Sequence, residues 1–219
     1  MFDCPPASLL NRRIPKSKFL ANSHPSTRLR DLLTTQVGTI TWLAKLSPES
    51  TNLSATSAVA EIEVFHLTLK EKEINPDLLD FLDKTVPHPI FFRIQNKEGE
   101  CSHSAAFKRP HEVNAGDWVL SSRFSTDFAS SPPTFPPLPT ALDLDKLYLT
   151  LFELLLPLSS RSGESLEALI NRNKQHQTLS RQARALENKL NREKQFNRKV
   201  VFNQELNALR LEIQQKENS

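Results

Sequence analysis

The fold is indicated most clearly by three neighbouring runs: VAEIEVFHLTL at residues 59–69, PDLLDFLDK at residues 76–84 and PIFFRIQ at residues 89–95. The first and third runs are rich in β-branched and aromatic residues, which is typical of strands. The middle run has apolar residues at helical spacing, namely Leu78, Leu79, Phe81 and Leu82. The stretch therefore predicts a strand–helix–strand unit, with strands buried on both faces of a covered sheet.

Further strands are predicted at residues 39–46, 101–108 and 117–124, the second of them returning from a hairpin turn at residues 96–100. Helices are predicted from Ser26 to Val37, ended by Gly38, and from Asp143 to Leu156, ended by Pro157. The fold class that follows is α+β, a small mixed or antiparallel sheet with packed helices and a C-terminal helical hairpin or coiled coil.

The 219 residues are enough for one hydrophobic core and an appendage. We expect a basic N-terminal arm at residues 1–25, an α+β core domain at residues 26–158 and a helical tail at residues 162–219. A Pro-rich connector at residues 127–141 belongs to the core domain.

The tail carries two apolar seams with steps of three and four residues. The first consists of Leu179, Ala183, Leu186 and Leu190; the second consists of Phe202, Leu206, Leu209 and Ile213. The seams are out of phase, so the tail is either one long helix with a discontinuity or a hairpin that turns near residues 195–198. We favour the hairpin, because two short seams can bury each other. Self-association through the tail stays open.

The composition excludes several classes of function. Hydrophobic residues make up 38% of the chain, charged residues 24%, and the net charge is +3, which is typical of a soluble protein. Two separated cysteines, and no apolar segment at the N-terminus, predict a cytoplasmic protein without disulfides or a zinc site. The run at 143–156 is too short and too charged to span a membrane. We find no phosphate-binding Gly-rich loop, nucleophile elbow or metal-ligand cluster, and we predict no metal and no cofactor.

Two carboxylates form the one candidate catalytic constellation. Glu61 and Glu63 share a strand face about 7 Å apart, and Lys45 lies on the preceding strand. A divergent metal-dependent nuclease using Lys45, Glu61 and Glu63 is the alternative hypothesis, although the usual Glu-x-Lys pattern is missing. It requires that the three side chains point into one cleft. His66, on the opposite strand face, is interpreted as a hydrogen-bonded structural histidine.

Two basic segments are candidates for contact with nucleic acid. In the N-terminal arm the candidates are Arg12, Arg13, Lys16 and Lys18, interleaved with Ile14 and Phe19; in the tail they are Arg181 and Arg184. The alternative is that these cations only solvate an arm and a helix surface. No known DNA-reading motif accompanies them, and aromatic residues are not interleaved as in single-strand binding proteins, so any contact is expected to be with the backbone.

Four segments carry a resemblance to a known family: residues 11–16 (NRRIPK), residues 42–48 with 51–53 (WLAKLSP and TNL), residues 61–65 (EIEVF) and residues 193–200 (EKQFNRKV). In this order they resemble an uncharacterised bacterial and archaeal domain-of-unknown-function family of about this length. The resemblance implies a gene beside restriction-type helicases and DNA methyltransferases, and it brings no catalytic residues. The leading expectation is a non-enzymatic accessory protein that docks on a helicase or DNA methyltransferase through its tail and also contacts nucleic acid.

Overall fold

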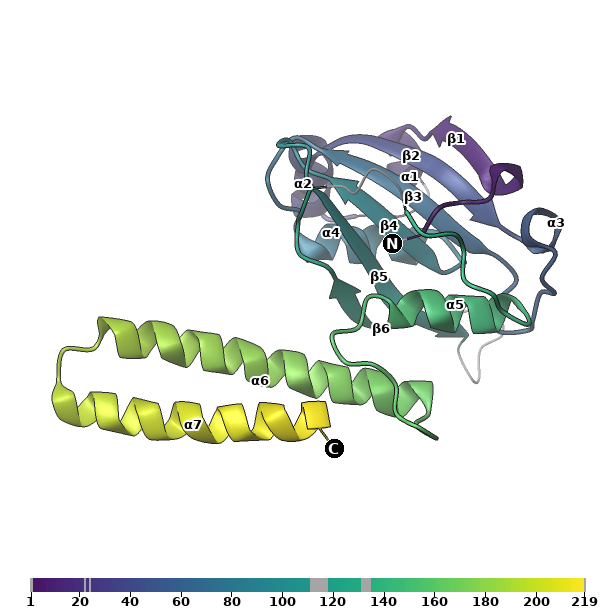
Figure 1. Ribbon diagram of the computed structural model, residues 1–219. Coiled ribbons are helices and arrows are strands. Elements are labelled where there is room, and N and C mark those ends of the chain that lie inside the picture. The colour runs from purple at the N-terminus through teal and green to yellow at the C-terminus, as the bar shows by residue number, and fades with distance from the viewer. Residues whose placement is uncertain (1, 22, 24, 111–117, 131–134, 219) are drawn as a thin grey trace. The chain divides into compact units, whose positions relative to one another are not determined.

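The computed structural model describes residues 2–21, 23, 25–110, 118–130 and 135–218 (Figure 1). The chain divides into two compact units, Met1–Leu155 and Leu156–Ser219. Asp117 and residues 131–134, which belong to a predicted strand and to the predicted connector, lie outside the described residues. The two units are treated separately below.

The first unit is built on a six-stranded mixed sheet whose spatial order follows the sequence. Its strands are β1 (Leu9–Arg13), β2 (Val37–Leu46), β3 (Ile62–Leu69), β4 (Ile90–Gln95), β5 (Cys101–Pro110) and β6 (Trp118–Ser125). Only β3 and β4 pair in parallel; the other four pairs are antiparallel. The predicted α+β class is confirmed.

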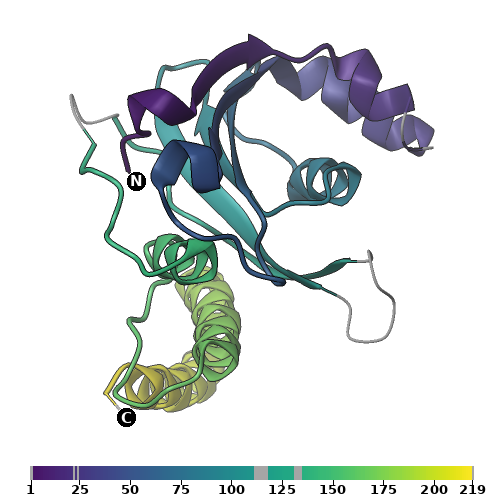
Figure 2. The same ribbon diagram turned by 90° about the vertical axis from the view of Figure 1, so that its right-hand side faces the viewer.

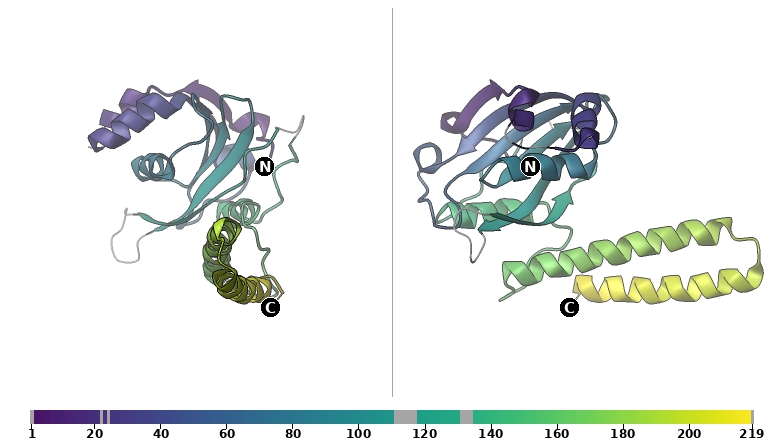
Figure 3. Two further views of the ribbon diagram at one scale, coloured as in Figure 1. Left: turned by 90° about the vertical axis from the view of Figure 1, so that its left-hand side faces the viewer. Right: turned by 180° about the vertical axis from the view of Figure 1, so that it is seen from behind.

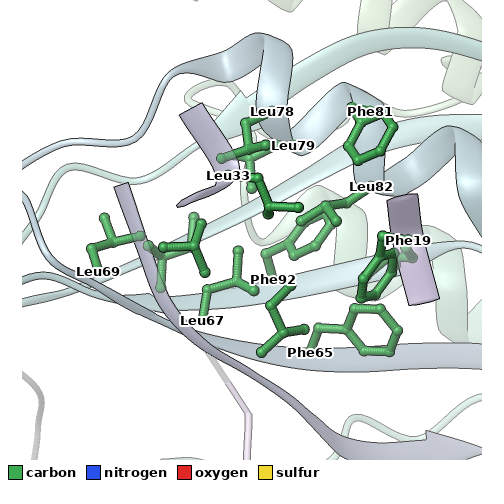
Figure 4. Packing of buried hydrophobic residues seen from close by; sticks show 14 residues of the cluster. Phe19, Leu33, Phe65, Leu67, Leu69, Leu78, Leu79, Phe81, Leu82 and Phe92 are labelled. Atoms are coloured by element: carbon green, nitrogen blue, oxygen red, sulfur yellow. The ribbon is translucent and has the colours of Figure 1, made fainter. Parts of the chain in front are cut away.

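The strand–helix–strand unit is present as β3, α4 (Pro76–Thr85) and β4. The Asn75 side chain caps α4 by accepting a hydrogen bond from the Asp77 N–H at 2.9 Å, and Pro76 occupies the first helical turn, where its missing N–H costs nothing. The apolar side of α4 packs with α2 (Thr27–Gln36) and α1 (Lys16–Ala21) on one face of the sheet, where Leu33, Leu67, Leu78, Leu82 and Phe92 are buried together (Figure 4).

The opposite face of the sheet is covered by α5 (Leu144–Glu153). The Tyr148 ring contacts Phe91 edge to face at 6.0 Å, and the Phe152 ring contacts Phe124 at 5.8 Å. Figure 2 shows α2 and α4 on one side of the sheet and α5 on the other. The central strands β3 and β4 are therefore buried on both faces, as predicted. The helix is shorter than the predicted span of residues 143–156, because the Asp143 side chain caps its start and the regular helix already ends at Glu153.

The N-terminal segment differs from the predicted arm. Residues 9–13 form β1, the edge strand of the sheet, after a short turn η1 (Pro6–Ser8) and before α1. All five β1 residues are exposed, so no buried periodicity marks the strand in the sequence. Pairing with β2 replaces that signal: Leu9 lies opposite Ala44, and Arg13 lies opposite Thr41.

Gly38 does not end the helix before it, as the sequence suggested. The helix α2 ends at Gln36, and Gly38 is the second residue of β2. A Cβ at this position would lie 3.0 Å from the Thr68 hydroxyl oxygen and 3.1 Å from its carbonyl oxygen, so β3 approaches closely here and a larger residue would need Thr68 to shift by a few tenths of an ångström. A short helix α3 (Pro48–Thr51) follows β2.

The second unit is a hairpin of two helices, α6 (Leu166–Arg192) and α7 (Phe196–Asn218), which confirms the favoured arrangement (Figure 3). The predicted seams are its buried sides: Leu206 is fully buried, and Leu179, Leu186, Leu209 and Ile213 are half-buried. The chain turns at Glu193, whose carboxylate accepts hydrogen bonds from the backbone N–H groups of Lys194 at 2.8 Å and Gln195 at 2.9 Å.

An ion pair closes the open end of this hairpin. The Arg172 guanidinium binds both carboxylate oxygens of Glu164, at 2.8 and 2.7 Å, and also donates to the Lys216 carbonyl near the end of α7 at 3.1 Å. None of the helices within the described ranges combines the length and the apolarity needed to cross a membrane.

Candidate functional site

A cavity of about 560 Å³ lies in the first unit, between β1, the middle of β2 and β3, and the turn that follows α4. Three kinds of side chain line it. The cations Arg12, Arg13 and Lys18 come from β1 and α1. The aromatic rings are those of Phe19 in α1, Trp42 in β2 and Phe65 in β3. The two further polar groups are Glu63 in β3 and His88 in the turn after α4. Ile14, Pro15, Thr85, Val86 and Pro87 complete the lining.

Strand pairing places the cationic and aromatic groups beside one another. Arg12 lies opposite Trp42, and Trp42 lies opposite Phe65, so the three form one row across β1, β2 and β3. The register of β1 shifts between Leu9 and Arg12, and within that interval Asn11 has a left-handed backbone with φ of 48°. Such a bulge redirects the side chains that follow it, here the two arginines.

An acidic cluster borders the cavity. Glu61 is paired with the Lys45 ammonium, and its other oxygen lies 3.1 Å from His88 Nε2. Glu63 is only 3% exposed and accepts a hydrogen bond from the Trp42 indole N–H. Lys45, Glu61 and Glu63, predicted as an alternative catalytic set, are therefore brought together, although only Glu63 lines the cavity.

At neutral pH the carboxyl group of Glu63 is neutral and that of Glu61 is negatively charged. Burial raises the pKa of Glu63 to about 8, the Trp42 hydrogen bond opposes this, and the negative charge of Glu61 adds to it. For Glu61, burial is outweighed by the hydrogen bond from Lys45 and, at the acid pH where the imidazole is protonated, by the charge of His88, so its pKa lies below the usual range. One proton is thus held by the pair, on Glu63, while Glu61 is the anion.

Within the described ranges, no group of three or more histidine, cysteine, aspartate or glutamate side chains is arranged to hold a metal ion. Burial lowers the pKa of His88, so its imidazole is neutral at pH 7. The two carboxyl groups are therefore satisfied by a cation on Glu61 and by a proton and the Trp42 indole N–H on Glu63, whereas His88 Nδ1 is buried with no hydrogen-bond partner among the described residues.

The predicted nucleic-acid contacts divide into three groups. Arg12, Arg13 and Lys18 line the cavity with exposed side chains and have no ion pair with any described residue. Lys16 does not join them, because its ammonium donates to the Val37 carbonyl oxygen. Arg181 and Arg184 are exposed on α6 of the other unit.

Sequence reasoning missed Trp42 and His88 as parts of the site. His88 stands between two prolines in a turn without any motif, and its position depends on a distant residue. The buried Lys108 of β5 donates to the backbone carbonyls of Asp83 at 2.7 Å, Val86, and His88 at 3.2 Å, and so fixes this turn. His66 does not line the cavity, and its imidazole makes no hydrogen bond within the described ranges, in contrast to the prediction.

Comparison with known proteins gives one positive finding. No curated protein and no solved structure matches the chain. One family matches residues 2–213, which is nearly the whole chain and covers the cavity and both helices of the hairpin. The chain therefore belongs to the family described as Domain of unknown function (DUF4391).

Proposed function

We propose that this protein is a non-enzymatic accessory protein of a DNA restriction or phage-defence system in the cytoplasm. In this proposal the first unit binds the backbone of nucleic acid, and the helical hairpin docks on a helicase or DNA methyltransferase. The observation that carries the nucleic-acid part is the group Arg12, Arg13 and Lys18, three exposed cations that line one cavity without ion pairs to described residues. Unpaired cations on a concave surface bind phosphates by releasing counterions.

The alternative, a metal-dependent nuclease using Lys45, Glu61 and Glu63, is supported by the convergence of these side chains. It is disfavoured by their charges. Lys45 already neutralises Glu61, and Glu63 carries a proton at neutral pH, so the pair offers a divalent cation little negative charge. Binding therefore remains the better-supported function.

The docking part of the proposal draws on α7. Apart from the buried seam, this helix exposes four large apolar side chains: Phe196 (76%), Val200 (41%), Val201 (49%) and Leu211 (61%). At about 100° per residue, Phe196, Val200 and Leu211 fall within a stripe roughly 60° wide on a side of α7 away from the seam, whereas Val201 lies about 80° outside it. An exposed apolar stripe of this kind is typical of a surface that contacts another protein. A second copy of this chain is the alternative occupant.

Nucleic-acid binding is tested by fluorescence anisotropy with labelled single- and double-stranded DNA at several salt concentrations. The variant R12Q/R13Q/K18Q is expected to bind at least tenfold more weakly and to lose about two from the salt-dependence slope, at roughly 0.7 per phosphate contact in single strands. The comparison variant R181Q/R184Q removes two exposed cations from α6 instead, and it should leave the affinity and the slope unchanged if the first unit binds the nucleic acid. Equal affinity of the wild type and the first variant would refute the site.

Docking is tested by co-expressing the full-length protein with the helicase or methyltransferase encoded beside it. The variant V200K/L211K charges the stripe, whereas the control N197K/A208K adds the same charge at exposed positions of α7 outside both the stripe and the seam. Loss of co-purification with the first variant alone supports the proposal. Co-purification of both variants would place the contact elsewhere, and the absence of any complex with wild type would exclude the adaptor role.

A further inference from the structure

We propose that the cavity accepts one unpaired base of a single-stranded nucleic acid, held by stacking on its aromatic wall while the adjacent phosphates contact Arg12, Arg13 and Lys18. The inference rests on the proposed function, because the same cations hold the phosphates. It adds the class of ligand: a single strand rather than a duplex, bound without preference for one base.

One wall of the cavity is aromatic. Trp42, Phe65 and Phe19 line the cavity, and the Phe65 ring contacts Phe19 edge to face at 6.3 Å and Phe92 at 6.2 Å. The wall is thus continuous with the packed core, and its indole is fixed by the hydrogen bond to Glu63. Rigid aromatic faces of this kind are the stacking platforms of proteins that bind single strands.

The cationic and aromatic groups of the cavity follow one another in a fixed order. The row from Arg12 through Trp42 to Phe65 leads from an exposed guanidinium to a half-buried indole and then to a buried phenyl ring. A nucleotide has its groups in the matching order: a solvated phosphate that can face the guanidinium, and a flat base that can face the aromatic rings. An acidic peptide carries the anion without the ring and would leave the aromatic wall uncovered.

The polar groups of the cavity explain why no base should be preferred. Glu63 is occupied by Trp42 and Glu61, and His88 Nε2 lies against Glu61. The Glu63 carboxyl group and His88 Nε2 are therefore engaged within the cluster, and His88 Nδ1 is buried without a hydrogen-bond partner among the described residues, so none of these atoms is presented to a base edge. Because Glu63 is neutral, it also does not repel a neighbouring phosphate. Stacking alone tolerates any base.

The size of the cavity is compatible with this ligand. Its volume of about 560 Å³ lies within the range of roughly 300–1,000 Å³ of pockets for small molecules and cofactors. A duplex keeps its bases paired and stacked inside the helix, so it can reach the rim cations but presents no free base to the cavity.

The experiment uses Trp42 as its own probe. The chain has two tryptophans, and Trp118 lies outside the cavity, against the Lys108 ammonium at 5.7 Å. Full-length W118F protein is titrated with short oligothymidylate, oligoadenylate, an abasic strand of equal length, the corresponding duplex and free thymidine monophosphate. If W118F does not fold, the wild type is titrated instead, and the change in its total tryptophan fluorescence is followed.

We expect both base-containing strands to quench Trp42 and to bind at least fivefold more tightly than the abasic strand, the lower bound for one stacked base. Equal affinity for the abasic strand, or equal quenching by the duplex, would overturn the inference while leaving backbone binding intact. Quenching by the mononucleotide without binding of strands would also overturn it, in favour of a free nucleotide. Failure of every nucleic acid to bind would refute the proposed function itself.

Discussion

Replacing Glu63 by glutamine is expected to stabilise the first unit increasingly as the pH rises from about 4.5 to about 8, and to the full extent at alkaline pH. The pKa of Glu63 is about 8 in the folded protein, because of burial, against an ordinary value of 4.5. Between these two values the folded chain holds a proton that the unfolded chain has lost. Stability therefore falls as the pH rises through this window and changes no further above it. Glutamine keeps an acceptor for the Trp42 N–H and a donor for Glu61, and it does not ionise.

The magnitude follows from the same two values. At about 1.36 kcal/mol per pH unit, the interval from 4.5 to about 8 corresponds to roughly 5 kcal/mol. Glu61 does not change this interval, because its pKa is lowered in the folded state, so that it titrates below 4.5, and because E63Q retains it. We take on the order of 3–5 kcal/mol for the difference between E63Q and wild type, which is roughly 6–20 °C in melting temperature for a chain of this size.

The assay is thermal unfolding followed by tryptophan fluorescence, since Trp42 and Trp118 both belong to the first unit. At about pH 4 the wild type and E63Q should melt within about 2 °C of each other, and at about pH 9 E63Q should melt ~6–20 °C higher. The control is E71Q, an exposed glutamate outside the cluster, which should follow the wild type at both values. A constant difference between E63Q and wild type across the pH range would refute the assignment of the proton to Glu63.

Two further predictions concern groups that hold the site and the hairpin in place. Replacing the buried Lys108 by methionine leaves three backbone carbonyls at the end of α4 and in the turn after it without their donor. The free energy of unfolding, measured in urea, should therefore fall by about 2–4 kcal/mol. The control K84M, on the exposed side of α4, should change it by less than about 0.5 kcal/mol. Hydrogen bonds from Arg172 hold the pKa of Glu164 at about 2. Far-ultraviolet circular dichroism should therefore show the hairpin losing thermal stability as the pH falls from 4.5 towards 2. R172M should lower the stability of the hairpin at neutral pH and flatten this acid dependence, and an unchanged acid profile of R172M would contradict the role of the pair.

Local patterns were sufficient for the central elements. The strand β3, the helix α4 and the strand β4 are recognisable because their burial follows the short periods of a strand and a helix, and each is buried by its immediate neighbours in the chain. The hairpin of α6 and α7 was predictable for the same reason, since its two seams bury one another. In both cases the information lies within about forty residues.

The strand β1 and the cavity could not be predicted in this way. All residues of β1 are exposed, so the strand exists through its pairing with β2, some thirty residues later. The same pairing places Arg12 beside Trp42 and Phe65, and the distant Lys108 fixes the turn that carries His88.

The sequence by itself therefore determined the central strands and helices, the helical hairpin and the charged side chains available to a site. Only the tertiary structure decided that Arg12, Trp42 and Glu63 share one cavity, and that Glu63 is neutral at pH 7. The physical reason is that burial and long-range pairing set both the neighbours and the solvation of a group, and neither is encoded in the residues beside it.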